Sequence, residues 1–481
     1  MLDFDKVHEE CGVFGVYAKS EQTDVVMNTY FALYALQHRG QQACGIAVND
    51  DGVITCYKQL GLVPDIFTGD VLAKLGTGKM AVGHVLYSNT GSSGAVNAQP
   101  LVVRHVKGSM SLVNNGSLVN AMELREQLEM DGCIFHTTND AEVISYMITR
   151  ARLKSNSIEE AIAKAMPELK GAYSMVIMSP QKMIAVRDPE GMRPLSIGTM
   201  PDGSYVFSSE TCGFDTIGAK FLRDLRPGEI VVCDENGLRS IDTHCGRKGK
   251  LCVFEFVYIA RPDSVIEGTS VHEARLRAGE FLAIEHPAQA DVVIGAPDSG
   301  VDAAIGFARQ SGIPYGMGFI KNRYVGRTFI QPTQAMRENA VHIKLNAIAS
   351  TVKDKRVVLI DDSIVRGTTC KRTVKLLKEA GAKEVHLRIS APAFTNPCYF
   401  GVDIDSCDKL IACRMTMDEI KEFLGVDSLG YLSIESVKKL APEAKCDFCV
   451  GCFNGEYPVE APKQPQTCKF DCKISENKKN S

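Results

Sequence analysis

Two adjacent carboxylates, Asp361 and Asp362, stand where an apolar run gives way to small polar residues. The whole stretch, residues 357–369, reads VVLIDDSIVRGTT. Carboxylate oxygens bind Mg²⁺ and accept hydrogen bonds from sugar hydroxyls. The unpaired N–H groups at a helix N-terminus favour a phosphate. This one stretch therefore offers ligands for a metal ion, a polyol and a phosphate.

The elements that must position these groups are a strand, a loop and a helix. We expect a buried strand over residues 357–360, a loop over 363–369 and a helix from Lys371 to Glu379. A plain strand, turn and helix with two solvated acids is the alternative, and the pattern alone leaves it open. The stretch contains neither GxxxxGKS/T nor GxGxxG, so it is not a Walker loop or a dinucleotide fingerprint.

Strands and helices alternate on both sides of this stretch. Residues 292–295 and 384–390 have strand patterns, and residues 302–310 have a helical pattern. This alternation predicts a parallel sheet that is covered on both faces. Ligands bind such sheets beyond the carboxyl ends of the strands, where APDSG (296–300) also lies.

The N-terminal half has a different order, with short apolar strands and only two helical stretches. The strands are expected at residues 11–18, 45–49, 110–113, 172–178 and 183–186. The helices are expected at residues 24–37 and 141–153, and Thr138 or Asn139 can cap the second. Mixed strands with two helical faces predict a layered α/β or α+β domain.

Composition excludes several classes of function. The 481 residues suffice for roughly two to four domains. Charged residues make up 23% with a net charge of −4, so there is no basic excess for nucleic acid. No apolar run approaches the roughly 18 residues that span a membrane, and residues 1–10 lack the apolar core of a signal peptide. We expect a cytoplasmic protein without nucleic-acid or membrane partners.

Cysteine is unusually frequent, with 17 residues in the chain. The segment CDFCVGC contains Cys446, Cys449 and Cys452, and its two CxxC steps have metal-ligand spacing in a region that we expect to be otherwise helical. Spacing alone leaves zinc, an Fe–S cluster and no metal open. Cys468 and Cys472 follow in a Lys-rich tail that we expect to be disordered.

Six sequence blocks in the first half together resemble the glutamine amidotransferases of the N-terminal-nucleophile class. They are CGVFGVY (11–17), LQHRGQQACGI (36–46), GHVLYSNTG (83–91), NNGSLVN (114–120), TNDAEV (138–143) and RDPEGMRPL (187–195). The resemblance implies an αββα glutaminase domain over residues 11–245, with Cys11 as its nucleophile. It also implies that residues 1–10 are a leader, and we expect autocatalytic or in-cell removal between Glu10 and Cys11.

The chemistry that this resemblance implies suits the residue types. A Cys11 thiolate attacks the side-chain amide of glutamine, the free α-amine acts as the base, and ammonia leaves a thioester that water hydrolyses. Asn115 and the Gly116 N–H match the oxyanion hole of the class. Asp140 matches the acid that holds the α-amino group of glutamine, and Arg39 matches an arginine that closes over glutamine.

One position departs from the pattern of the class. The motif is usually GHxRY, whose arginine pairs with the α-carboxylate of glutamine, but this chain has GHVLY with Leu86 in that place. A charge-assisted contact contributes about 1.5 to 3 kcal/mol. Its loss raises the KM for glutamine about 10- to 100-fold, unless Arg39 or Arg104 substitutes. We expect weaker glutamine binding with intact chemistry.

In the second half, the stretch 357–369 resembles the phosphoribosyl pyrophosphate (PRPP) loop of type I phosphoribosyltransferases. The segment 296–300 resembles their pyrophosphate loop, and KNRYVGRTFI (321–330), with Arg327, resembles their flexible loop. The implied PRPP contacts are Asp298, Ser299, Lys321, Arg323, Asp361, Asp362, Ser363, Arg366, Gly367, Thr368 and Thr369. The implied Mg²⁺ ligands are Ser299, Asp361 and Asp362.

The cysteines resemble those of family members that carry a 4Fe-4S cluster. The implied ligands are Cys252 in CVFEFVYIARPDS, Cys398 in NPCYFG, and Cys449 and Cys452 in CVGCFNG. Cys446 is extra to this set, and we interpret it as a spare thiol.

Nearly the whole chain resembles the glutamine PRPP amidotransferases of the cluster-containing type. The resemblance implies a leader over 1–10, a phosphoribosyltransferase domain over 250–430 and a C-terminal segment over 431–481. It implies conversion of PRPP, glutamine and water to 5-phosphoribosylamine, pyrophosphate and glutamate, the first step of purine synthesis. It also implies internal ammonia transfer, Mg²⁺, inhibition by purine nucleotides, and a homotetramer or dimer.

Two alternatives compete with this interpretation. Another N-terminal-nucleophile amidotransferase, such as a glucosamine-6-phosphate or asparagine synthase, lacks the stretch 357–369. A PRPP-binding regulatory homologue with impaired glutaminase activity is favoured only by Leu86. Four residues argue against that homologue: Cys11, Asn115, Gly116 and Asp140.

Overall fold

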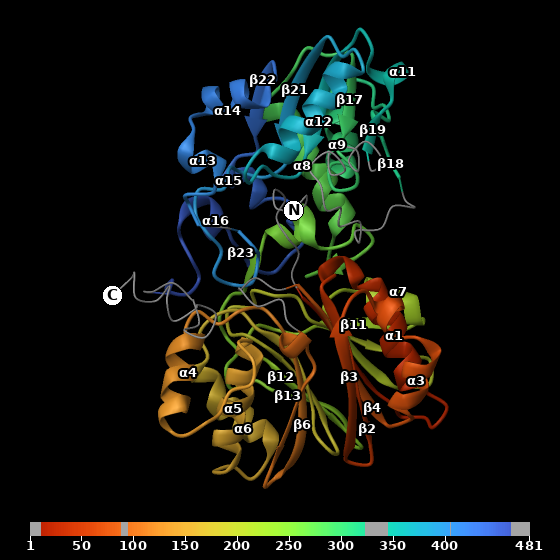
Figure 1. Cartoon of the computed structure of the whole chain (residues 1–481), viewed down its shortest axis with the longest axis vertical. Coiled ribbons are helices and arrows are strands. Elements are labelled where there is room, and N and C mark those ends of the chain that lie inside the picture. The colour runs from red at the N-terminus through yellow and green to blue at the C-terminus, as the bar shows by residue number, and fades with distance from the viewer. Residues whose placement is uncertain (1–10, 88–94, 323–344, 405, 463–481) are drawn as a thin grey trace.

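The computed structural model describes residues 11–87, 95–322, 345–404 and 406–462. Its two lobes are stacked along the long axis of the molecule (Figure 1). One lobe holds two antiparallel sheets from the first half of the chain, and the other holds a four-stranded parallel sheet from the second half. Among the described residues, no helix is long and apolar enough to cross a membrane.

The first sheet of the N-terminal lobe has seven antiparallel strands. In order across the sheet they are β11 (Lys220–Asp224), β9 (Ser196–Thr199), β10 (Tyr205–Ser208), β1 (Gly12–Tyr17), β4 (Met80–Leu86), β2 (Ala43–Asp50) and β3 (Val53–Leu60). The helices α1 (Val25–Ala35), α3 (Gly69–Leu75) and α7 (Cys212–Ile217) cover its outer face (Figure 1). The Asp24 side chain caps α1 by accepting the Met27 N–H.

The second sheet has six antiparallel strands. They are β13 (Gly237–Ile241), β12 (Ile230–Asp234), β8 (Met183–Arg187), β7 (Ser174–Met178), β6 (Gly108–Asn115) and β5 (Leu101–His105). The helices α4 (Ala121–Met130), α5 (Asp140–Arg152) and α6 (Ile158–Ala165) cover its outer face. The inner faces of the two sheets share one apolar core, which contains Val13, Val82, Val113 and Val176. The result is the expected αββα arrangement.

The C-terminal lobe is built on parallel strands β17 (Val292–Gly295), β20 (Arg356–Asp361), β21 (Glu384–Ile389) and β22 (Ser428–Tyr431). Successive residues of β20 point to opposite faces. Val358 and Ile360 enter the core beneath α8 (Val271–Glu285) and α9 (Val301–Ser311). Val357 and Leu359 enter the core beneath α12 (Thr368–Glu379) and α14 (Met417–Leu424). Both faces are therefore covered, as the continuous apolar run of this strand predicts.

Two sequence expectations were wrong in detail. The helix expected from Lys371 begins at Thr368, because Gly367 takes a positive φ of 85° at the N-cap and lets the chain turn earlier. Thr368 and Thr369 thus lie in the first turn of α12 rather than in a loop. The segment around Cys449 is not helical throughout. It forms strand β23 (Asp447–Cys449), because it pairs in parallel with β14 (Lys250–Cys252), and a short helix, α16 (Gly451–Asn454), follows.

Candidate active sites

Cys11 lies immediately before β1, in the middle of the seven-stranded sheet. Its thiol donates to the Tyr87 carbonyl at 3.6 Å. The half-buried side chain packs against a small apolar cluster of Ala43, Leu86 and Ala98. The sulfur therefore sits at the end of a rigid strand, where a neighbouring backbone carbonyl orients it.

Asn115 is the last residue of strand β6 in the six-stranded sheet, and Gly116 follows it. The Asn115 side chain is fully buried, and neither its amide oxygen nor its amide nitrogen has a hydrogen-bond partner among the described residues. An unpaired buried amide costs about 1 to 3 kcal/mol, so this donor is directed to a group outside the folded chain. Gly116 has a φ of 123°, and a Cβ there would lie 2.4 Å from the Ala172 carbonyl oxygen.

His84 connects the end of β6 to the sheet that carries Cys11. It pairs with Val13 across β4 and β1, and its Nε2 lies 3.0 Å from the Asn114 carbonyl oxygen. Burial lowers the pKa of His84 to about 3, so the imidazole is neutral and holds the loop by a hydrogen bond, not by charge. The amide of Asn115 is thereby fixed beside the end of the nucleophile's sheet.

Asp140 opens helix α5, with Asn139 as its cap. Its Oδ2 accepts the Leu118 N–H at 2.7 Å, which ties the carboxyl group to the loop after Gly116. Burial raises the pKa of Asp140, and this hydrogen bond opposes the rise. The sequence prediction that one of two residues caps this helix is confirmed for Asn139, whose side chain accepts the Ala141 N–H at 2.9 Å.

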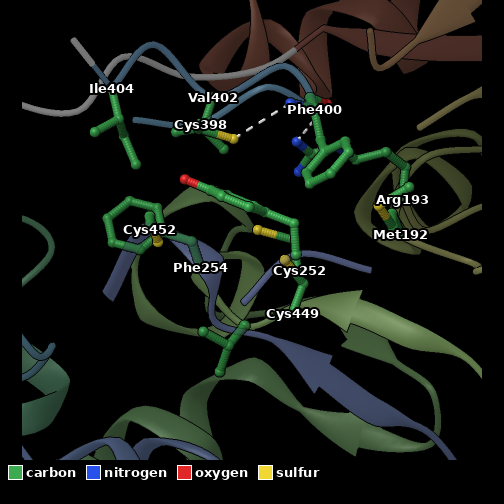
Figure 2. A pocket seen from close by; sticks show the side chains of 12 residues that line it. Met192, Arg193, Cys252, Phe254, Cys398, Phe400, Val402, Ile404, Cys449 and Cys452 are labelled. Carbon is green, nitrogen blue, oxygen red and sulfur yellow. Dashed lines mark hydrogen bonds between the residues drawn. The ribbon is translucent and has the colours of Figure 1, made fainter. Parts of the chain in front are cut away.

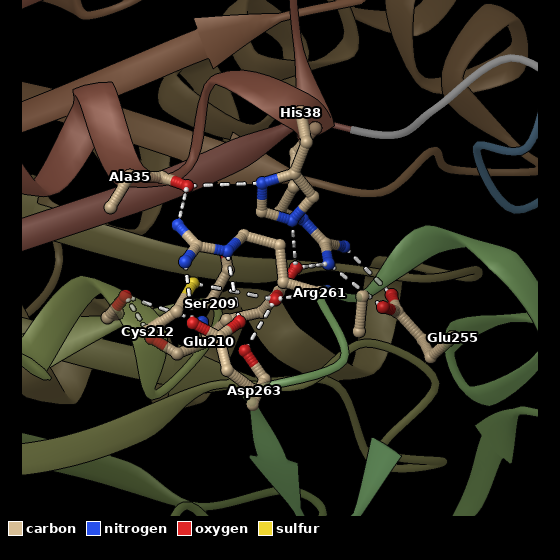
Figure 3. A network of polar contacts seen from close by, with 12 residues as sticks. Ala35, His38, Ser209, Glu210, Cys212, Glu255, Arg261 and Asp263 are labelled. Carbon is tan, nitrogen blue, oxygen red and sulfur yellow. Dashed lines mark hydrogen bonds and ion pairs between the residues drawn. The ribbon is translucent and has the colours of Figure 1, made fainter. Parts of the chain in front are cut away.

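Arg39 is fully buried and contacts Glu210 and Glu255, two residues that are labelled in the polar network of Figure 3. Its Nε donates to the Cys11 carbonyl at 3.0 Å. Its other nitrogens pair with Glu210 at 2.6 Å and with Glu255 at 2.8 Å. That Arg39 closes over glutamine stays a prediction. In this structure the arginine connects the backbone of Cys11 to two buried carboxylates.

Glu210 is the hub of this network and was missed in the sequence. His38 contacts it at 2.8 Å, and the Arg261 N–H donates to it at 2.9 Å. Burial alone would raise the pKa of Glu210, but His38 and Arg39 outweigh burial and lower that pKa well below its ordinary value. Glu210 and Glu255 are far from Cys11 in the sequence. No local sequence pattern therefore predicts that they form a network with Arg39.

Arg39 and Arg104 were the two candidates to bind the α-carboxylate of glutamine in place of the missing motif arginine. Neither presents a guanidinium group over the Cys11 thiol. Arg39 is engaged as described, and Arg104 is exposed on β5, which is an edge strand of the other sheet. Leu86 itself is 6% exposed and packs in the apolar cluster that contacts Cys11. The position that would carry the arginine thus adjoins the nucleophile directly.

The candidate PRPP site lies beyond the carboxyl ends of β17 and β20. Asp361 and Asp362 are 2% and 1% exposed. The Ser299 hydroxyl donates to the Asp362 carboxylate, which brings the two predicted loops together. Lys321 pairs with Asp298 at 2.6 Å on the exposed side of the site. Buried carboxylates at this edge, in front of the N-terminus of α12, form a site for a polyol and an anion.

The rest of the loop lies close to these carboxylates. Ser363 donates its hydroxyl to Asp362, and Arg366 precedes the glycine that starts α12. Several expected residues lie outside the described part of the chain: residues 1–10, Arg323, Arg327, Cys468 and Cys472.

The four expected cluster cysteines line a single cavity between the lobes (Figure 2). They are Cys252, Cys398, Cys449 and Cys452. Cys252 and Cys449 are opposite each other in the parallel pair of β14 and β23. The Phe400 N–H donates to the Cys398 sulfur at 3.4 Å.

The chemistry of this cavity suits a buried metal cluster. Its other walls are mostly apolar, and Met192 and Arg193 from the N-terminal lobe complete them. Burial raises the pKa of Cys449 to about 11 and holds the pKa of Cys452 well above its ordinary value, and the neighbouring Cys398 raises both. Within the described ranges, no group of three or more His, Cys, Asp or Glu side chains is already drawn into metal-binding geometry. Four thiols that line one cavity nevertheless match the number and type of ligands that a 4Fe-4S cluster requires.

Known protein families match both lobes. The glutamine amidotransferase domain family matches residues 92–215, and the phosphoribosyl transferase domain family matches residues 270–427. The amidophosphoribosyltransferase of Synechocystis sp. is 50% identical over 97% of this chain and 94% of its own length. The amidophosphoribosyltransferase of Bacillus subtilis is 45% identical over 96% of each chain.

Two solved structures are similar over nearly their whole length. The glutamine PRPP amidotransferase of B. subtilis in complex with ADP and GMP superposes with a TM-score of 0.88 at 44% identity, over 94% of this chain and 98% of the other. A structure described as the allosteric regulatory enzyme of purine biosynthesis gives a TM-score of 0.89 at 44% identity, over 97% and 100%.

Proposed function

This chain belongs to the amidophosphoribosyltransferase family, and we propose that its two lobes divide the family reaction between Cys11 and the PRPP loop. The chain is a glutamine PRPP amidotransferase of purine biosynthesis, a pentosyltransferase. The reaction converts PRPP, glutamine and water to 5-phosphoribosylamine, pyrophosphate and glutamate. The observation that carries our assignment of residues is the buried, unpartnered amide of Asn115 beside the sheet that holds Cys11.

In the N-terminal lobe, the Cys11 thiolate attacks the glutamine side-chain amide. The tetrahedral oxyanion receives hydrogen bonds from the Asn115 amide and the Gly116 N–H, which are held in place before substrate arrives. Asp140 holds the α-amino group of glutamine. Arg39 acts as a positioning residue, because it fixes the carbonyl of Cys11 and with it the direction of the thiol.

The base is the α-amine of Cys11, so residues 1–10 must be removed first. While the peptide bond between Glu10 and Cys11 remains, that nitrogen is an amide and cannot accept a proton. Intact-mass measurement on the purified protein should find Cys11 at the N-terminus. A fully active form that retains Met1 would contradict the processing step.

In the C-terminal lobe, Asp361 and Asp362 hold the ribose hydroxyls of PRPP, and the loop from Ser363 to Thr369 holds its 5-phosphate. We assign the binding of the pyrophosphate to Asp298, Ser299, Lys321 and Arg323. Mg²⁺, bound by Ser299 and the two carboxylates, would neutralise charge on the leaving pyrophosphate. The support for this assignment is the burial of both carboxylates at the switch from strand to helix.

Ammonia passes from one lobe to the other inside the protein, which keeps it neutral and away from bulk water. Purine nucleotides are the expected inhibitors, and the similar B. subtilis enzyme is described in complex with ADP and GMP. A homotetramer or dimer in the cytoplasm completes the proposal.

We also assign the cysteine cavity to a 4Fe-4S cluster held by Cys252, Cys398, Cys449 and Cys452. When bound, such a cluster supplies a covalent cross-link between distant segments of the chain. Iron and sulfide analysis of anaerobically purified protein should give four of each per chain. A colourless, iron-free protein that is fully folded and active would contradict this assignment.

The experiment that best tests the whole proposal is a comparison of wild type with Cys11→Ala in two assays. The variant should lose PRPP-dependent glutamine hydrolysis and keep synthesis from added ammonia. A wild type that makes phosphoribosylamine from ammonia but never hydrolyses glutamine would instead favour the glutaminase-impaired regulatory homologue, for which Leu86 is the supporting residue.

A further inference from the structure

Two exposed cysteines outside both active sites share one hydrogen-bond acceptor. The Cys407 thiol donates to the Thr395 carbonyl at 3.5 Å, and the Cys413 thiol donates to the same oxygen at 3.3 Å. Two sulfurs that share one oxygen must lie close together. Consistent with two adjacent thiols, the pKa of Cys413 is raised by burial and by the neighbouring Cys407. They form a thiol pair at the surface of the C-terminal lobe.

The backbone holds this pair together. The Lys409 N–H donates to the Ser406 carbonyl at 2.9 Å, and the Leu410 N–H donates to the Cys407 carbonyl at 3.3 Å. The Cys413 N–H then donates to the Leu410 carbonyl at 3.2 Å. Residues 406–414 thus form a turn followed by the short helix α13 (Ile411–Arg414), with both thiols directed to Thr395.

The thiol pair contacts the segment that leads to the cysteine cavity. The Thr395 N–H donates to the Cys452 carbonyl at 3.1 Å, and the Thr395 hydroxyl donates to the Phe453 carbonyl at 2.7 Å. Cys398 follows three residues later. Thr395 therefore lies between the thiol pair on the outside and two cavity cysteines on the inside.

The helix α13 also contacts the PRPP loop. The Ile411 N–H donates to the Val365 carbonyl at 2.8 Å. The Ile411 side chain lies 2.8 Å from the position that a Cβ on Gly367 would occupy. Through these contacts of Ile411, a shift of the segment between Cys407 and Cys413 would reach the loop that is assigned to the 5-phosphate.

We propose that Cys407 and Cys413 form a reversible disulfide by exchange with a low-molecular-weight disulfide, and that this bond weakens PRPP binding. In the first step one thiolate attacks the small disulfide, forms a mixed disulfide and releases one small thiol. In the second step the other cysteine attacks the mixed disulfide and releases the second small thiol. One S–S bond of the reagent is reduced, one forms in the protein, and two protons pass from the protein thiols to the two released thiols.

Both thiols are exposed, so a small disulfide can reach either of them, and we assign the first attack to Cys407. The pKa of Cys413 is raised by burial and by the neighbouring Cys407 thiol, so Cys413 is suited to the second, intramolecular attack. Once the disulfide forms, Thr395 loses both of its S–H donors. The loop effect rests on the proposed PRPP site, whereas the disulfide itself does not.

The test uses the full-length protein, oxidised glutathione as the probe and dithiothreitol for reversal. Peptide mass spectrometry should find residues 407 and 413 cross-linked, with the loss of two free thiols. The KM for PRPP with ammonia as nitrogen donor should rise about fivefold, the effect of about one lost neutral hydrogen bond. Dithiothreitol should restore it. Cys407→Ser and Cys413→Ser should keep the reduced KM in oxidised glutathione, while Cys133→Ser, which removes an unrelated half-buried thiol, should respond like wild type.

Three results have separate meanings. Stable glutathione adducts without a 407–413 cross-link overturn the disulfide. A cross-link with an unchanged KM for PRPP overturns its effect on the loop. A reduced wild type without any ammonia-dependent synthesis contradicts the proposed function instead, and the cross-link is still decided by mass spectrometry.

Discussion

The Nε of Arg39 donates a hydrogen bond to the carbonyl oxygen of Cys11 at 3.0 Å, from a guanidinium that is fully buried. The same guanidinium pairs with Glu255, a residue of the segment that enters the C-terminal lobe. The backbone of Cys11 is thus contacted by a side chain that also forms an ion pair with a residue of the segment leading into the C-terminal lobe. This single contact links the orientation of the thiol to the packing of the two lobes.

Arg39→Lys should slow glutamine use without weakening glutamine binding. Lysine keeps the charge but lacks the planar fork that reaches three partners at once. The loss of a charge-assisted bond predicts a fall in kcat of about 10- to 100-fold with an unchanged KM for glutamine. Steady-state kinetics with glutamine and with ammonia measure this. An equal loss in the ammonia reaction would show a general folding defect instead.

Glu210→Gln should change the dependence of stability on pH. The folded-state pKa of Glu210 lies well below the ordinary 4.5, so its stabilisation is present above pH 4.5 and is lost as pH falls through the folded-state pKa. The variant should lose about 3 kcal/mol of unfolding free energy at pH 7 and less at more acidic pH. Urea unfolding across this range tests it, with the exposed Glu126→Gln as control. A difference that stays constant with pH would contradict the prediction.

Leu86→Arg should lower the KM for glutamine about 10- to 100-fold with little change in kcat. The new guanidinium would lie beside Cys11, where a bidentate contact with the α-carboxylate of glutamine becomes available. Leu86→Met keeps the volume without the charge and serves as the matched control. An unchanged KM in the arginine variant would show that the carboxylate is already bound by another group.

Asp362→Asn should raise the KM for PRPP about 10- to 100-fold, because the amide loses the charge that binds Mg²⁺ and presents a donor where Ser299 also donates. The ammonia-dependent assay isolates this effect from glutamine chemistry. The control is Asp354→Asn, an exposed position with a φ of 59° that asparagine tolerates. Similar effects of both substitutions would argue against a role in PRPP binding.

Local patterns predicted those elements whose cause is local. The apolar run at residues 292–295 matches strand β17, and the cap at Asn139 starts helix α5 as expected. The prediction was less accurate for elements whose secondary structure depends on contacts with residues far away in the sequence. Strand β23 exists because β14, about 200 residues earlier in the chain, supplies its partner.

The same contrast between local patterns and long-range contacts applies to the candidate sites. Cys11, Asn115 and Asp362 stand in recognisable motifs, so the sequence points to them. The contact of Arg39 with Glu255 could not be predicted, because the two residues are 216 positions apart in the sequence. The thiol pair at Cys407 and Cys413 has no motif, and only the turns between the two cysteines bring them together.

The pairing of β14 with β23 also determines when the cysteine cavity can form during synthesis on the ribosome. Cys252 is synthesised early, but the strand that carries Cys449 emerges only after nearly two hundred further residues. At about 5 to 20 residues per second, that interval lasts about 10 to 40 s. During that time the half-formed cavity has no closing wall. Its completion therefore reports that translation has reached the C-terminal segment, and chains that stop short cannot acquire it.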